Sequence, residues 1–137
     1  MTDKKPTFRA IGVAHFSIPV SDLAKSIDFY VENVGLRFVS KIPPEGMAFL
    51  DANGVAVILV QHDKGNSTAG NPKVHHSFMV DHDQFDTVVE GLKARGIELV
   101  FEDLRTGTVN GPKVFLWDPD GHQIEILDRT SYRGHYL

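Results

Sequence analysis

The sequence predicts an α+β fold built from two similar modules, each running strand, helix, strand, strand, strand. Two amphipathic helices of similar length, 22–33 and 83–95, lie at equivalent places in the two halves of the chain. In both helices apolar residues recur three and four positions apart, which is the spacing of one helix face. Strand-like apolar runs surround each helix, so the pattern indicates an internal duplication.

The first half begins with a strand and continues into the helix 22–33. Ser21 and Asp22 are candidate caps for the start of this helix, and the helix ends before Gly35. The turn 51–54, Asp-Ala-Asn-Gly, joins the last two strands as a hairpin. The strands expected in this half are 13–20, 36–40, 48–50 and 55–61.

The second half repeats this order. Asp83 is the expected cap of the helix 83–95, and Gly96 closes its end. The turn 118–121, Asp-Pro-Asp-Gly, makes the closing hairpin. The strands expected here are 74–80, 97–101, 113–117 and 123–127.

Alignment of the two halves on their first strands places His15 against His75 and Val20 against Val80. Gly35 then falls against Gly96 with one inserted residue, which a duplication explains simply. We therefore expect a single domain over 1–137. Its parts are module one at about 10–62, a Gly- and Asn-containing linker at about 63–73, module two at about 74–128 and a C-terminal tail at 129–137.

Length and charge limit the classes of partner. With 137 residues and 42% apolar composition, the chain can bury a core as one domain. A net charge of −4 from scattered residues excludes a basic stripe for nucleic acid. No run reaches the roughly 18 apolar residues of a membrane helix, and the N-terminus is charged, so we expect a cytoplasmic protein. Because there is no cysteine, any metal must be held by nitrogen and oxygen.

A single curved sheet with one helix leaves its other face open. Two such modules are expected to pair as curved mixed sheets around a cavity. The duplication puts His15 and His75 on equivalent strands, and Glu125 lies between two isoleucines on the last strand. Taken singly, Glu125 is better explained as a solvent-exposed residue, and each histidine as an exposed or hydrogen-bonded strand residue. Together, two imidazoles and one carboxylate can bind a divalent metal and leave positions open for a substrate.

Three segments carry a resemblance to a known family. The segment HFSIPVSDLAKSIDFYVENVGLRF at 15–38 resembles the first module of glyoxalase I and its relatives in the vicinal oxygen chelate superfamily. The segments HHSFMVDHDQFDTVVEGLKARGIEL at 75–99 and FLWDPDGHQIEIL at 115–127 resemble the second module and its closing hairpin. The resemblance covers almost the whole chain.

The resemblance implies one divalent ion, Fe2+, Mn2+, Zn2+ or Ni2+, held by His15, His75 and Glu125. We prefer His75 to His76, because only His75 keeps the five-residue distance to Val80 that His15 keeps to Val20. Strand alternation also turns His76 to the opposite face.

One departure from the family pattern bears on the reaction. Glyoxalase I and methylmalonyl-CoA epimerase have a fourth ligand near the end of module one, where this chain has Leu59 or Val60, with Gln61 and His62 close but out of register. Three ligands resemble instead the fosfomycin-resistance enzymes and the extradiol dioxygenases. The chain lacks the Ser- and Tyr-bearing run of the former, and the latter usually carry four modules.

We therefore expect a metal-dependent enzyme for a small substrate that chelates the ion through neighbouring oxygens. A dioxygenase-like reaction is preferred to a glyoxalase-like lyase or isomerase, because the fourth ligand, a general base, is missing. Candidate catalytic residues are Glu125, His62 and Tyr132, the last in a tail that also contains His135 and Tyr136 and is equally well read as a partly ordered terminus.

One rival function class stays open, and the sequence also predicts an oligomeric state. The rival class is a metal-free protein that only sequesters a ligand, as bleomycin-resistance proteins of this family do. Open sheet edges and apolar surface predict that two chains associate as a homodimer.

Overall fold

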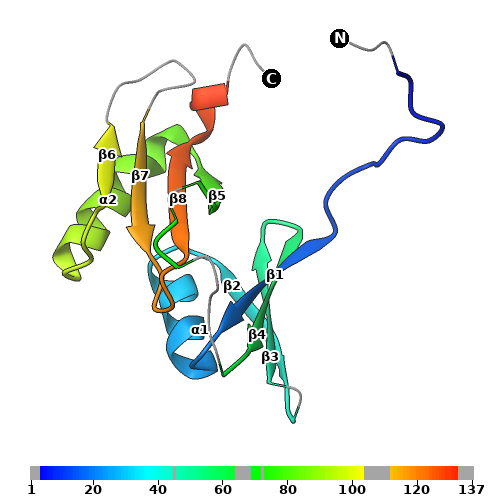
Figure 1. Ribbon diagram of the computed structural model, residues 1–137. Coiled ribbons are helices and arrows are strands. Elements are labelled where there is room, and N and C mark those ends of the chain that lie inside the picture. The colour runs from blue at the N-terminus through cyan, green and yellow to red at the C-terminus, as the bar shows by residue number, and fades with distance from the viewer. Residues whose placement is uncertain (1–3, 45, 64–68, 72, 104–111, 133–137) are drawn as a thin grey trace.

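The computed structural model describes residues 4–44, 46–63, 69–71, 73–103 and 112–132, and the side chains of 101–103 and 131–132 lie outside this description. Each half of the chain folds into its own four-stranded mixed sheet with one α-helix (Figure 1). The predicted α+β fold of two strand-helix-strand-strand-strand modules is therefore confirmed.

Sheet A, from module one, has the strand order β1-β4-β3-β2. Its first strand runs parallel to β4, and the other neighbours are antiparallel. The turn between β3 and β4 places Asn53 at φ 51° and Gly54 at φ 100°, conformations that favour these residue types. The elements of module one are β1 His15–Val20, α1 Leu23–Glu32, β2 Arg37–Ile42, β3 Met47–Ala52 and β4 Val55–Gln61.

Sheet B, from module two, repeats the pattern with the order β5-β8-β7-β6, and β5 is parallel to β8. The elements of module two are β5 His75–Val80, η1 His82–Gln84, α2 Phe85–Ala94, β6 Phe101–Asp103, β7 Lys113–Trp117, β8 Gln123–Asp128 and η2 Arg129–Tyr132. The expected strand 97–101 is wrong, because β6 begins only at Phe101. The N–H of Ile97 instead bonds the carbonyl of Leu92 at 3.0 Å and so completes the end of α2.

The two helices start differently. Asp22 caps α1 as expected, since its carboxylate accepts a hydrogen bond of 3.1 Å from the N–H of Lys25. Asp83 does not cap α2, because it lies inside the 3-10 turn η1, and Gln84 takes the cap position without a side-chain bond. The expectation for Asp83 is therefore wrong.

Strand alternation divides each sheet into a core face and an outer face. In β1, Ile18 and Val20 are fully buried, whereas His15 and Ser17 are exposed. The equivalent strand β5 buries Phe78 and exposes His75. Both outer faces therefore turn away from the helices, and the histidines lie on them.

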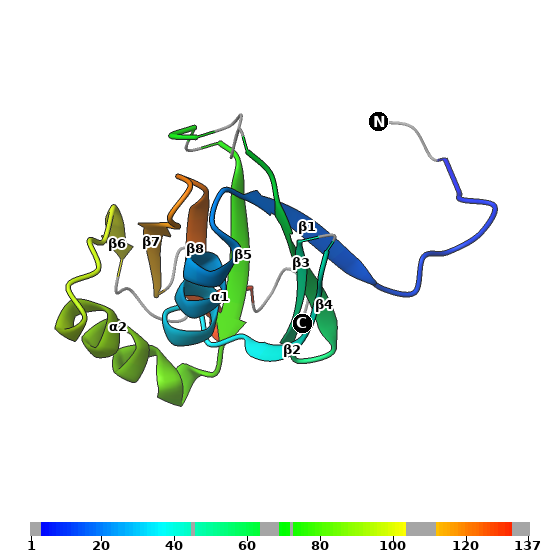
Figure 2. The ribbon, with the colours of Figure 1, turned by 90° about the horizontal axis from the view of Figure 1, so that it is seen from below.

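The modules contact each other through their core faces. Phe16 of β1 lies 6.1 Å from Phe78 of β5, between ring centroids. Helix α1 lies beside β8 of the second module in both views (Figures 1 and 2). The outer faces of the two sheets consequently do not face each other within one chain. In the described part of the chain, no helix combines the length and apolar character needed to cross a membrane.

Candidate metal centre

Half of the candidate site lies on the outer face of sheet B. Ile124 and Ile126 are fully buried in the core, so the intervening Glu125 points to the opposite side, where it is only 6% exposed. His75 is on the same face at the start of β5. The distance from His75 Nε2 to Glu125 Oε1 is 3.7 Å, too long for a hydrogen bond. Both groups therefore keep lone pairs for an ion about 2 Å from each.

The surroundings hold this pair in place and leave one polar atom unused. The ring of Phe115 meets the His75 ring edge-on, at 5.6 Å and 73°. Gln123 pairs in register with His75, and its buried Oε1 has no hydrogen-bond partner among the described residues. An orphaned buried acceptor beside two ligand-type side chains fits a site that a bound group completes.

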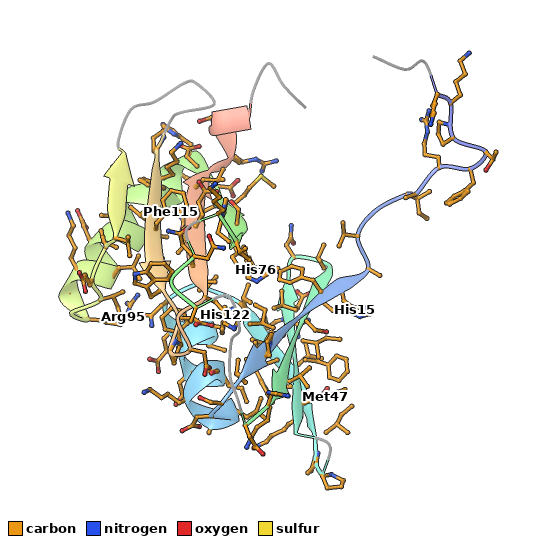
Figure 3. The ribbon with its side chains drawn as sticks, in the orientation of Figure 1. His15, Met47, His76, Arg95, Phe115 and His122 are labelled. Atoms are coloured by element: carbon orange, nitrogen blue, oxygen red, sulfur yellow. The ribbon has the colours of Figure 1, made fainter. Side chains whose placement is uncertain are left out.

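His15 lies elsewhere. It is exposed on the outer face of sheet A, and Figure 3 shows it on the side of β1 away from His76 and module two. Within the described residues, no three His, Asp or Glu side chains gather closely enough to hold an ion. One chain therefore brings His75 and Glu125 together and leaves His15 apart, and the three-ligand site stays a prediction.

The two sheets can be compared by register to find the place of a fourth ligand. Ser77 pairs with Glu125 in sheet B, and the equivalent Ser17 pairs with Ile58 in sheet A. The structural counterpart of Glu125 is thus Ile58, not Leu59 or Val60. The position remains apolar, so module one supplies no fourth ligand there.

His76 lies on the core face of sheet B and not on the outer face with His75 and Glu125. Its ring stacks on Phe16 at 5.2 Å with an interplanar angle of 13°. Burial, followed by the nearby rings of His122 and His75, lowers the pKa of His76 below its ordinary value. The choice of His75 over His76 as neighbour of Glu125 agrees with this geometry.

Of the other candidate catalytic residues, His62 does not lie beside Glu125. His62 follows β4, and its N–H bonds the carbonyl of Val20 at 2.8 Å. Because β4 is parallel to β1 and its Ala56 pairs with His15, His62 lies at the opposite end of sheet A. Tyr132 ends η2, but its side chain lies outside the described residues, as do His135 and Tyr136.

A polar junction between the modules was not foreseen from the sequence. The phenol of Tyr30 in α1 donates a hydrogen bond of 2.5 Å to Asp118 Oδ2 in the β7–β8 turn. His122 Nε2 donates to the carbonyl of Pro19 at 2.7 Å, and its N–H bonds Asp118 Oδ1 at 2.8 Å. The N–H of Ser21 bonds both carboxylate oxygens of Asp120 at 3.1 Å. We call Tyr30, Ser21, Asp118, Asp120 and His122 the module clamp.

Burial shifts the pKa of two residues of this clamp, Tyr30 and Asp118. It raises the pKa of the Tyr30 hydroxyl, and the neighbouring Asp118 carboxylate raises it further, so Tyr30 stays a donor. Burial also raises the pKa of Asp118, while the bond from Tyr30 and the proximity of His122 oppose this. The sequence signal for the clamp is the Asp-Pro-Asp-Gly-His turn, whose residue types predict only a hairpin loop.

A second interaction that the sequence does not predict joins His82 to Asp128 at the end of β8. His82 Nδ1 forms a short hydrogen bond with the buried Asp128, whose other oxygen accepts bonds from Thr130 at 2.8 and 2.9 Å. The hydrogen bond to Asp128 raises the pKa of His82 above its ordinary value. Burial opposes ionisation of Asp128, but the bonds from Thr130 and His82 hold its pKa below the usual range.

The sequence and fold can now be compared with known proteins. The profile of the Glyoxalase/Bleomycin resistance protein/Dioxygenase superfamily matches residues 12–126. The chain belongs to this superfamily. The predicted family is thereby confirmed, and the two modules seen here are the units that the match spans.

Three similar proteins show the range within the superfamily. The metallothiol transferase FosB of Lysinibacillus sphaericus is 28% identical and covers 88% of this chain and 87% of its own. A lactoylglutathione lyase of Neisseria meningitidis is 31% identical, covering 85% and 90%. The fosfomycin resistance protein FosX of Listeria monocytogenes, solved with Mn(II) and sulfate, superposes with a TM-score of 0.71 at 22% identity, covering 88% and 91%.

The first two relatives are named as enzymes, one a transferase and one a lyase. The prediction of a superfamily enzyme is confirmed at that level. The FosX likeness shows the shared fold. Neither relative is named as a dioxygenase, so the reaction is taken up as a proposal.

Proposed function

We propose that this protein is a divalent-metal enzyme whose site forms between two copies of the chain. His75 and Glu125 of one copy and His15 of the other would hold the ion. The observation that carries this proposal is the division of the ligand set over two outer faces that do not meet within one chain. A second copy whose sheet A lies against sheet B completes the set, and its two-fold symmetry makes two equal sites.

The side chains of the pair suit such an ion. Two imidazoles and one carboxylate leave adjacent positions open and accept iron, manganese, zinc or nickel. When bound, the ion would polarise neighbouring substrate oxygens and stabilise the negative charge that develops on them. Phe115 fixes the ring of His75. Gln123 Oε1, which has no hydrogen-bond partner in the part of the chain that the structure describes, would accept a hydrogen bond from a substrate hydroxyl.

The face that would cover the ion favours an apolar or aromatic substrate with neighbouring oxygens. Register places a run of apolar side chains beside His15 on the outer face of sheet A. These are Ala56, Ile58, Val60, Phe49, Met47 and Ile42. Sheet B adds Phe115 and Trp117. Ile58 offers no general base, and this supports a dioxygenase-like reaction, in which the substrate and dioxygen bind side by side, over hemithioacetal isomerisation.

Addition of a thiol to a small oxygen-rich substrate is the second candidate. The name of FosB, a metallothiol transferase that matches 88% of this chain, favours it. Against it, few cationic side chains lie on the two outer faces as the strand register defines them: Arg37 pairs with Asp51, and Lys113 pairs with Leu127.

Mixed dimers test whether the site is shared. His15→Ala and Glu125→Gln chains, each carrying a different affinity tag, are co-expressed and the mixed dimer is isolated. A shared site leaves one intact site per mixed dimer, so we expect about half the metal of the wild-type dimer and almost none in either parent. A site built within one chain leaves the mixed dimer without metal, which would overturn the shared arrangement.

The reaction class is tested on metal-loaded wild-type protein. We expect the iron form to give a charge-transfer band with catechol and to consume dioxygen with a suitable diol. Thiol addition to fosfomycin by the manganese form would establish the second candidate. Efficient isomerisation of the glutathione hemithioacetal by the zinc or nickel form would reject both and direct attention to Gln61 and His62.

A further inference from the structure

Gln123 is a buried polar residue on the same face as the proposed metal ligands, and one of its polar atoms is not used. It begins β8, the strand that lies between β5 and β7 in sheet B (Figure 1). Strand alternation puts its side chain on the outer face with Glu125, two residues further on. Only 6% of Gln123 is exposed, and Oε1 has no hydrogen-bond partner among the described residues. Buried acceptors without a donor are rare and costly, so this atom indicates a donor that comes from a bound molecule.

Two side chains that can donate flank Gln123, and neither bonds its Oε1. The register sets His75 of β5 on one side and Trp117 of β7 on the other. An imidazole and an indole each carry an N–H that could serve as donor, but Oε1 accepts from neither. Nε2 of His75 lies instead 3.7 Å from Oε1 of Glu125. In the described part of the chain, the Gln123 acceptor is therefore left for a molecule that binds beside His75 and Glu125.

The equivalent position in sheet A is small and apolar. His75 pairs with Gln123 in sheet B. The equivalent His15 pairs with Ala56 in sheet A, so Ala56 is the counterpart of Gln123. In the proposed shared site, the second copy would bring Ala56 next to its His15, and a methyl group leaves room there that a longer side chain would fill. Sheet A thus offers no donor from this position, and the polar contact comes from Gln123.

We propose that Gln123 determines substrate specificity by accepting a hydrogen bond from a hydroxyl group next to the oxygen that binds the ion. The inference rests on the proposed function. An amide oxygen accepts and cannot donate, so it distinguishes oxygens that carry a hydrogen from oxygens that do not. The substrate class is then a compound with a free hydroxyl beside a second oxygen, such as a vicinal diol. Epoxides, dicarbonyl compounds and O-methylated diols lack that hydrogen and would leave Oε1 buried without a donor, which disfavours them.

Two ligands and two variants test this inference on zinc-loaded protein, because zinc has no redox chemistry and the ligands are not consumed. Catechol carries the second hydroxyl, and 2-methoxyphenol has a methyl ether in its place. Gln123→Met keeps the length of the side chain and removes the acceptor. Gln84→Met, at an exposed position before α2, is the matched control.

Calorimetric titration gives the ratio of the catechol affinity to the 2-methoxyphenol affinity for each protein. This ratio should fall by about tenfold or more in Gln123→Met and stay unchanged in Gln84→Met. Comparing ratios between proteins cancels the weaker binding of a methyl ether to the ion itself. A ratio in Gln123→Met equal to that of the wild type would overturn the proposal.

A second measurement separates a role in recognition from a role in folding. Because Oε1 of Gln123 has no donor among the described residues, its removal should not lower the thermal midpoint of the metal-free protein. A clear fall in Gln123→Met would show that the residue is structural and would overturn the proposal.

The outcomes also separate this inference from the proposed function. Wild-type protein that binds zinc but shows no preference for catechol would reject the role of Gln123 and leave the metal site standing. Loss of zinc from Gln123→Met would show that the residue supports the ion and not the substrate, which also rejects the role. Wild-type protein that takes up no zinc or other divalent ion would reject the proposed function, and this inference with it.

Discussion

At the scale of single residues, the position of Glu125 follows from its two isoleucine neighbours. Because Ile124 and Ile126 fill the core, the pleat turns the carboxylate to the outer face, and the sequence alone indicates this much. Its burial there could not be foreseen, since it depends on neighbouring strands. This buried carboxylate, 3.7 Å from His75, is the anionic ligand of the proposed metal site.

Glu125→Gln should weaken metal binding by about tenfold or more. Replacing a residue that only hydrogen-bonds a metal ligand already costs about tenfold in affinity, and Glu125 is proposed as a ligand itself. The amide keeps the shape of the side chain, so the thermal midpoint of the metal-free protein should change little. Calorimetric titration with Mn2+ or Zn2+ measures the affinity. Glu98→Gln, at an exposed position before β6, is the matched control. Equal affinities in the two variants would remove Glu125 from the site.

His82 should make stability depend on pH. Its pKa is raised in the folded state, mainly by the hydrogen bond to Asp128. Its stabilising contribution is thus complete below the unfolded value, about 6.5, and is lost as the pH rises through the higher folded value. The thermal midpoint of His82→Ala should fall below that of the wild type at pH 6 and approach it by pH 9. A difference independent of pH would contradict this assignment.

At the scale of helices and strands, the apolar periodicity of the sequence predicts those elements that short-range interactions determine. Both helices and seven of the eight strands appear where the apolar pattern places them, within a few residues. The exception is the segment 97–101. Ile97 closes the end of α2 and packs on the core with Leu99, and the ladder with β7 begins only at Val100 and Phe101. The two helix caps differ in the same way. Asp22 caps α1 as the sequence predicts, whereas Asp83 lies inside a 3-10 turn and does not cap α2.

The clamp offers a prediction about contact between elements. Tyr30→Phe removes the donor to Asp118 and leaves a buried carboxylate with fewer bonds, so unfolding should become easier by about 1–3 kcal/mol. Urea denaturation measures the change. In Tyr30→Phe with Asp118→Asn the two losses should be clearly less than additive, because the residues share one interaction. Additive losses would show that the pair is not coupled.

At the scale of the whole molecule, the sequence predicts two modules but not their relative orientation. Equivalent strands carry His15 and His75, so the sequence predicts that the three proposed ligands converge. Core-face packing through Phe16 and Phe78 turns the outer faces apart, and only long-range contacts decide this. The separation of His15 from Glu125 was therefore beyond any pattern in the chain.

The proposed shared ion would link metal binding to the association of two chains. If each ion joins two chains, removing it with a chelator should shift the equilibrium from dimer toward monomer, and the thermal midpoint should then depend on protein concentration. Sedimentation at micromolar concentration, with and without EDTA, measures the shift. The His15→Ala variant should behave like chelated wild type in both conditions. A chelated protein that stays fully dimeric would show that other contacts are sufficient.

The outer faces of the two sheets turn apart, and the angle between them affects how many chains can join. A chain with complementary faces on opposite sides can add copies head to tail without end, forming a fibre, unless the angle between the faces lets two chains close on each other. That angle is set where Tyr30 meets Asp118 and His122 meets Pro19. In the proposed dimer, the module clamp would thus affect polymer length as well as stability. A rigid junction would give a closed pair, and a loosened one would allow filaments to form.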